Sequence, residues 1–351
     1  MTKKDFKLSL SEKITFVSML TNYFQAEIPV SEALHLVEQD CSNRKIKYLA
    51  HSLTSAISKG NSLYKALEKF HGTFGDTFMA IARAGEESGE MDKNWKRLLT
   101  ILESEKQIRD KIIFAMIYPC ILTLIGLIVI VIFLGWVFPS FAETITGNGG
   151  QLPASLVFLL AFRAFIFSNF ILIGLAVAAA VVAFIYAMKQ KVCRDFVDKI
   201  AVKIPVLSNL IKYLNLMHFF AIFQVTYDAG IPIVRSLELA TSSVKNSYIY
   251  GKFKQIPIKI EKGLTIAKTL KMTDIVPFDM IAIISSGENS GKLGQMLQTV
   301  SKTLEEKVDA AIKALVKLIE PILIVIFGIF VLYMLVVFFK SNFAMLNSIP
   351  M

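Results

Sequence analysis

The sequence predicts an all-α membrane protein with two duplicated helical-bundle domains and three transmembrane helices. The prediction rests on an internal duplication, on three long uncharged runs, and on apolar residues at helical spacing. The motif Gly-Glu-x-Ser-Gly occurs at residues 85–89 and again at 287–291. The two halves align around this motif. The offset is 203 residues before the motif, where residues 28–29 align with 231–232, and 202 residues from the motif onward. This period is far too long for a solenoid repeat, and each copy therefore represents a whole domain.

The first predicted domain covers residues 1–111, and we expect a bundle of five or six short helices. Apolar residues recur at separations of three, four and their multiples, and include Leu34, Val37, Leu49, Leu53, Leu63 and Leu67. The sequence Ala-Glu-Ile-Pro at 26–29 marks one turn between helices, and Lys-Gly at 59–60 marks another. The second predicted domain, residues 189–317, has matching turns at 229–232 and 262–263.

Three runs contain no Asp, Glu, Lys or Arg: residues 112–142, 164–188 and 321–339. A helix needs about 20 residues to cross the hydrocarbon core of a bilayer, so each run is long enough. We expect transmembrane helices at 112–138, 164–188 and 318–339, with a loop at 139–163. Pro119 and Pro321 lie near the membrane boundary, where an internal proline would kink each helix.

Lys and Arg are concentrated in the two predicted domains, with 17 in residues 1–111 and 19 in residues 189–317 out of 38. Segments rich in these residues stay on the cytoplasmic side of a membrane. Both domains and the N-terminus are therefore expected in the cytoplasm, with the loop 139–163 and the tail 340–351 outside. No apolar signal-peptide core precedes Glu12, so the first transmembrane helix would direct insertion.

The two predicted domains differ in charge, because residues 1–111 carry a net +2 and residues 189–317 a net +8. One interpretation is that basic residues are favoured beside an anionic inner leaflet. The other is that the second domain binds an acidic protein partner. The leaflet is the simpler interpretation.

The repeated motif offers eight candidate residues: Gly85, Glu86, Ser88, Gly89, Gly287, Glu288, Ser290 and Gly291. A phosphate-binding loop is disfavoured, because only three residues separate Gly287 from the Gly-Lys pair at 291–292, where that loop needs four, and Leu293 stands where Ser or Thr would bind magnesium. Glycines four residues apart on a helix would let a neighbouring helix approach closely. If the helix breaks there instead, the serine could cap the next helix. The glutamate would be exposed or would contact a basic partner; packing is favoured over partner contact for the motif as a whole.

No catalytic, cofactor-binding or metal-binding site is expected, and we do not expect an enzyme. The four histidines form no metal-binding pattern: His35, His51, His71 and His218. The sequence has no Gly-x-Ser-x-Gly elbow and no dinucleotide-binding glycine pattern. The three cysteines, Cys41, Cys120 and Cys193, lack metal-like spacing and are expected to be reduced.

These features resemble the PilC/GspF family, the inner-membrane platform proteins of type IV pilus assembly and type II secretion. The resemblance is carried by the two motif copies, each followed by Met91 or Leu293, by the Ile-Pro turns, and by Tyr-Pro at 118–119 with Glu-Pro at 320–321. It runs from about residue 12 to the C-terminus. Glu27 departs from the glycine of the family's first turn. The family's usual N-terminal extension is missing, and this short form is more similar to the platforms of type IVb pili.

The resemblance implies a non-enzymatic scaffold in the bacterial inner membrane, with 139–163 and 340–351 in the periplasm. The implied partners are a cytoplasmic hexameric assembly ATPase, pilin or pseudopilin subunits, other inner-membrane assembly proteins and further copies of the chain as a homo-oligomer, but no nucleic acid. The alternative is a small oligomeric membrane transporter or channel, which the lack of a clear acid or base within the predicted spans disfavours. A membrane-anchored enzyme is disfavoured by the missing catalytic motifs.

Overall fold

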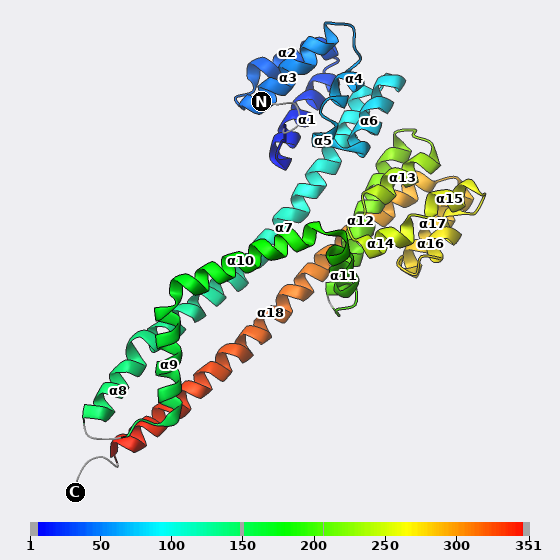
Figure 1. Cartoon of the computed structure of the whole chain (residues 1–351). Helices are drawn as coiled ribbons and strands as arrows, with labels where there is room; N and C mark the ends of the chain where they lie inside the picture. Colours follow the sequence, from blue (N-terminus) through cyan, green and yellow to red (C-terminus); the bar gives the residue numbers. More distant parts are fainter. Residues whose placement is uncertain (1–5, 148–150, 206, 347–351) are drawn as a thin grey trace. The chain divides into compact units, whose positions relative to one another are not determined.

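The computed structural model describes residues 6–147, 151–205 and 207–346, and every regular element within them is a helix (Figure 1). The all-α prediction is therefore confirmed. The chain divides into two compact units. The polar unit is formed by Met1–Lys111 and Asp198–Ala311, and the apolar unit by Ile112–Val197 and Ile312–Met351. The two segments of the polar unit correspond to the duplicated domains, and we call them the first and second repeats.

The first repeat contains six short helices followed by the start of a long one. They are α1 (Leu10–Gln25), α2 (Val30–Asp40), α3 (Arg44–Ile57), α4 (Leu63–Glu68), α5 (His71–Phe74), α6 (Asp76–Ser88) and α7 (Met91–Ile132). A capping box begins α1. In it the Glu12 amide donates to Ser9 Oγ at 3.3 Å, and the Ser9 amide donates to Glu12 Oε2 at 2.7 Å.

The second repeat follows the same order, except that residues 274–277, which align with α5, form no helix. Its helices are α12 (Leu207–Asp228), α13 (Ile233–Ser242), α14 (Ser247–Phe253), α15 (Ile256–Glu261), α16 (Ile266–Lys271), α17 (Phe278–Ser290) and the start of α18 (Leu293–Leu346). Two helices, α14 and α15, stand where the first repeat has the single helix α3. Pro257 lies at the start of α15, and its missing amide hydrogen prevents a continuous helix there. Thr54 holds the equivalent position in α3.

The core of the first repeat is built around Trp95, whose side chain is fully buried. Phe16, Phe24 and Phe78 meet its indole edge-on, with ring centroids 6.3, 5.4 and 5.7 Å away. Trp95 lies on α7, so the first turns of that long helix belong to the core of the repeat. The six residues whose spacing predicted helices are also buried: Leu34, Val37, Leu49, Leu53, Leu63 and Leu67.

The apolar unit contains the long uncharged segments of the chain. Besides the later parts of α7 and α18 it holds a π-helical segment (Phe133–Val137), α8 (Phe138–Gly147), α9 (Ala154–Ser168), α10 (Phe170–Lys189) and the beginning of α11 (Lys191–Ala201). Among the residues that the structure describes, two helical stretches are long and apolar enough to cross a membrane, Met91–Gly147 and Leu293–Lys340. The pair Ala154–Ser168 and Phe170–Ala183, bent by 71°, adds a third if it forms one span.

The segment 139–163 differs from the loop that we expected, because α8 continues to Gly147 and α9 begins at Ala154. Both helices are mostly apolar, with one charged residue each, Glu143 in α8 and Arg163 in α9, and Pro153 is the N-cap of the second. Residues 148–150 of this segment and 347–351 of the predicted tail lie outside the described residues. The two prolines predicted at the membrane boundary, Pro119 and Pro321, lie inside α7 and α18.

Helices α7 and α18 approach each other closely within the apolar unit. A Cβ atom on Gly126 would overlap the ring of Phe327, so the contact requires glycine. A buried cluster follows further along, formed by Leu134, Phe138, Ile145, Leu156, Leu159, Met334 and Val337. Many of the other large apolar side chains of this unit are exposed, as expected for residues that face lipid.

Candidate functional site

The repeated motif forms the C-terminal end of α6 in the first repeat and of α17 in the second. Gly89 and Gly291 end these helices with φ of +75° and +69°. Glycine is favoured in this left-handed conformation, which closes many helices. A Cβ atom on either residue would meet nothing within 4 Å. These two glycines therefore terminate helices and do not serve the close helix packing expected of them.

The other glycine of each copy does lie in a close contact. A Cβ atom on Gly85 would lie 2.9 Å from Cβ of Asn94, and one on Gly287 would lie 2.6 Å from Cγ of Met296. Asn94 and Met296 belong to α7 and α18, the helices that follow the motif. The first glycine of each motif thus lets two consecutive helices pack against each other.

The glutamate of each motif caps a short helix that precedes it in the chain. Glu86 accepts hydrogen bonds from the amides of Leu63 at 2.7 Å and Tyr64 at 2.9 Å, at the start of α4. Glu288 accepts from the amides of Ile266 at 2.8 Å and Ala267 at 3.2 Å, at the start of α16. The first amides of a helix have no partner within it, and a carboxylate there also suits the helix dipole.

The N-cap residue of each short helix completes this arrangement. Ser62 Oγ accepts from the amide of Lys65, and Thr265 Oγ1 accepts from the amide of Lys268, both at 3.3 Å. Two side chains from different parts of the chain therefore satisfy successive amides of one helix. The sequence predicts that each motif glutamate is exposed or contacts a basic partner, whereas the contacts in the structure are intramolecular.

The motif serines act differently in the two repeats. Ser88 Oγ accepts from the amide of Glu90 at 3.3 Å, just before α7 begins. Ser290 Oγ instead donates to the carbonyl of Ser286 at 2.7 Å, within its own helix. The serine is therefore a less uniform part of the motif than its two glycines and its glutamate.

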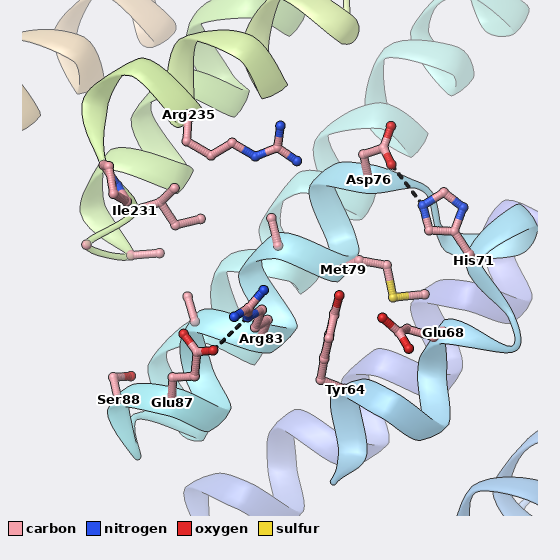
Figure 2. Close-up of a pocket in the computed structure, with 15 residues that line it drawn as sticks. Tyr64, Glu68, His71, Asp76, Met79, Arg83, Glu87, Ser88, Ile231 and Arg235 are labelled. Carbon is pink, nitrogen blue, oxygen red and sulfur yellow. Dashed lines mark hydrogen bonds and ion pairs between the residues drawn. The ribbon is translucent and has the colours of Figure 1, made fainter.

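A pocket of about 820 Å³ lies where the two repeats meet in the polar unit (Figure 2). One side is formed by α4, α5 and α6 of the first repeat, and the other by the turn between α12 and α13, residues 229–232. Ala80 and Ala84 of α6 line it and are half-buried. Behind the turn, Val225 of α12 is buried as part of the hydrophobic core of the first repeat.

Charged side chains surround the pocket. Arg83 pairs with Glu87 at 2.6 Å and His71 with Asp76 at 2.8 Å, all in the first repeat. Figure 2 shows Arg235 of α13 extending toward the part of α6 that carries Asp76.

Tyr64, also at the pocket, lies under the guanidinium of Arg83, which is 5.6 Å from its ring centroid. A hydrogen bond to Glu68 raises the pKa of the Tyr64 hydroxyl, and burial adds to this effect. The pocket thus combines charged side chains with apolar ones, the latter from α6 and from the 229–232 turn.

The remaining candidates stay apart from one another. His35 bonds to Gln39 and His51 to Glu38, each at 3.0 Å on the surface. His218 of α12 is half-buried, and burial together with nearby Lys245 lowers its pKa to about 4. Cys41 is buried and the other two cysteines are exposed, all with free thiols. Within the described ranges, no three His, Cys, Asp or Glu side chains gather as a metal site would require.

Sequence reasoning missed the residues that join the repeats, above all Val225, Arg235 and the α6 alanines. The signal was present in the alignment of the two halves. Equivalent positions should keep their chemistry if both copies are equally exposed, yet Val225 aligns with Asn22 and Arg235 with Glu32. Such changes at otherwise similar turns indicate different surroundings.

Comparison with known proteins places these observations in a family. The family model described as "Type II secretion system (T2SS), protein F" matches residues 16–139 and 219–339. Type II secretion system protein F of Pseudomonas aeruginosa is 26% identical over 325 residues, 93% of this chain and 80% of the relative. Type IV pilus assembly protein PilC of the same organism is 25% identical over 335 residues, with 95% and 90% covered. PilC of Thermus thermophilus is 28% identical over 323 residues, with 92% and 79% covered.

Proposed function

Because the chain belongs to the type II secretion system protein F family, we propose that it is a non-enzymatic platform of the bacterial inner membrane. It couples a cytoplasmic assembly ATPase to the insertion of pilin or pseudopilin subunits into a filament. The observation that carries this proposal is the extent of the family match, which covers most of both repeats and most of the long apolar stretches that follow them. Relatives named for type II secretion and for type IV pilus assembly match over nearly the whole chain.

The proposed orientation places both repeats and the N-terminus in the cytoplasm, with residues 139–163 and the C-terminal tail in the periplasm. It is supported by the 36 of 38 Lys and Arg residues that lie in residues 1–111 and 189–317. Reporter enzymes that work only in the periplasm should be active within 139–163 and silent at Gly60 and Gly263. Activity at Gly263 would contradict the orientation.

The motor in this proposal is a separate protein, because filament assembly requires work and the motif around Gly287 lacks the spacing of a phosphate-binding loop. The net +8 of residues 189–317, which include the second repeat, supports docking of an acidic ATPase surface there, since complementary charge speeds encounter and sets orientation.

The test is deletion of the gene in its native host. Surface filaments, or the proteins secreted by the corresponding system, should disappear and return when the full chain is supplied again. The tagged chain should also capture the assembly ATPase from membranes in low salt and lose it in high salt. Normal filaments and normal secretion in the deletion strain would overturn the proposal.

A further inference from the structure

Within the polar unit the second repeat already occupies one surface of the first. Val225 of α12 is 9% exposed because it packs into the core of the first repeat, and Ile231 of the following turn packs against the same core. The strip that receives this turn includes Ala80 and Ala84 on α6. Small side chains at positions four apart on one helix face let a neighbouring backbone approach closely.

The duplication gives each side of this contact an equivalent elsewhere in the chain. The equivalent of the receiving helix α6 is α17, where Ala282 and Ser286 replace the two alanines and are exposed. Phe278, at the start of α17, is 77% exposed. The equivalent of the inserted turn is residues 26–29 of the first repeat, where Ala26 is exposed although its counterpart Ala229 is half-buried. As far as the described residues show, one chain thus presents an unoccupied turn and an unoccupied receiving face.

The charges of the occupied and unoccupied surfaces are reversed as matched pairs. On the occupied pair, Arg235 stands at the start of α13 and Glu68 lines the receiving side of the pocket. At the equivalent positions of the unoccupied pair, Glu32 stands at the start of α2 and Lys271 ends α16. Both are exposed. Arg83 on the receiving side is paired with Glu87, and Asp279 on α17 is paired with Lys307. Outside these pairs, a basic residue of the turn beside an acidic residue of the face is replaced by an acidic residue of the turn and a basic residue of the face, so the combination stays complementary.

We propose that the unoccupied face of the second repeat, formed by α16 and α17, binds the 26–29 turn of a second copy of this chain. The charges disfavour the other combinations. The acidic turn of a first repeat would meet Glu68 and Asp76 on another first repeat, and the basic turn of a second repeat would meet Lys271. Discrimination of this kind by like-charge repulsion makes first and second repeats alternate along the assembly. This inference does not depend on the proposed function.

The apolar unit, taken by itself, shows the same pattern of one occupied and one open equivalent. Gly126 is covered by Phe327, whereas its repeat equivalent Gly328 has nothing within 4 Å. The equivalent of Phe327 is Ile125, which is 53% exposed. In a single chain, lipid would cover Gly328 and Ile125. The proposal therefore rests on the polar unit, and the apolar unit only shows a parallel pattern.

The experiment measures self-association of the full chain in lipid vesicles, by energy transfer between donor- and acceptor-labelled copies as lipid dilutes them. Glu32→Lys and Lys271→Glu should each weaken association roughly three- to tenfold, because each places like charges opposite one another. The double variant Glu32→Lys/Lys271→Glu restores opposite charges and should recover most of the association. Phe278→Asp, which installs the residue of the first repeat at this exposed position, should also weaken it.

The matched control is Lys252→Glu, which makes the same charge change at an exposed residue of α14; it should leave association unchanged. Thermal unfolding of each variant verifies that the fold is intact. The proposal is overturned if the wild-type chain stays monomeric, if neither single reversal weakens association, or if the double variant remains as weak as the singles.

Discussion

The first repeat ties its first helix to its third with a carboxylate, whereas the second repeat ties the equivalent helices with an amide. Glu12 accepts from Nδ2 of Asn43 at 3.1 Å and pairs with Lys45 at 3.5 Å. The aligned residue Asn215 accepts from the amides of Lys245 at 2.9 Å and Asn246 at 3.0 Å. Asn43 and Asn246 are themselves equivalent and cap the next helix in both repeats.

This difference shows what the duplication preserved. Backbone amides at helix starts remain satisfied in both copies, since an unsatisfied buried amide is costly wherever it occurs. The side chains that cap these amides kept their type, Asn43 and Asn246 here and the motif glutamates elsewhere, whereas the residue that ties the first helix to the cap changed from the carboxylate of Glu12 to the amide of Asn215. Net charge and outer surface could therefore diverge between the repeats without loss of the common fold.

The largest expected effect follows from the charge of Glu12. Its pKa is lowered to about 2, first by the hydrogen bond from the Ser9 amide and further by Asn43 and Lys45. A lowered pKa stabilises the folded state above the ordinary value of 4.5, and this contribution disappears as the pH falls toward 2. Thermal unfolding of the full chain should show wild type more stable than Glu12→Gln by about 2 kcal/mol at pH 7.

The gap between wild type and Glu12→Gln should close as the pH falls from about 5 to about 2. The control is Asn215→Ala, at the equivalent position of the second repeat. Because asparagine carries no charge, this change should lower stability by an amount that stays constant over this pH range. Parallel curves for wild type and Glu12→Gln at all pH values would contradict the role assigned to Glu12.

The next largest effect concerns the glycine inside each motif. Gly287→Ala should destabilise the chain by roughly 2 kcal/mol, since its Cβ would also lie 2.7 Å from Cβ of Met296 and 3.3 Å from the backbone of Leu293. Gly85→Ala should cost less, because only Asn94 is close. Thermal melts measure both.

The control for these variants is Gly251→Ala in α14, where a Cβ atom would meet nothing within 4 Å. Alanine is the better helix former, so this change should stabilise by about 0.5–1 kcal/mol. If the unfolding temperature of Gly287→Ala equals or exceeds that of wild type, α17 and α18 can move apart at this contact without loss of stability.

The smallest effect is expected from the capping glutamates. Glu86→Gln keeps one acceptor oxygen and removes the charge, and should cost about 1 kcal/mol. Glu288→Gln should cost slightly less, because its second hydrogen bond is longer, 3.2 Å against 2.9 Å. Hydrogen exchange of the full chain should speed up in residues 63–68 for the first variant and in 266–271 for the second. Faster exchange spread evenly over a whole repeat would indicate global destabilisation instead of a lost cap.

Much of the fold could be predicted because it depends on local patterns. Apolar spacing identified the helices of the first repeat, and the uncharged runs identified the apolar unit. The helices α8 and α9 within the segment 139–163 were not predicted, because the segment was defined by the ends of the neighbouring predicted spans and not by a helical pattern of its own.

The roles within the motif could not be read from spacing. Gly85 and Gly89 look equivalent in the sequence, and only the left-handed φ of the second separates a helix end from a packing contact. Likewise, the target of Glu86 lies 22 and 23 residues earlier in the chain. No local pattern connects a glutamate with amides so distant.

That separation has a consequence for the order in which the protein folds. Helices α4 and α16 have six residues each, too few to persist alone, because starting a helix is costly and only longer helices recover the cost. Their capping carboxylates arrive only when α6 and α17 have formed and packed. The two short helices are therefore expected to form late, after the folding transition state of each repeat, and substitutions such as Ala66→Gly should speed unfolding while leaving the folding rate nearly unchanged.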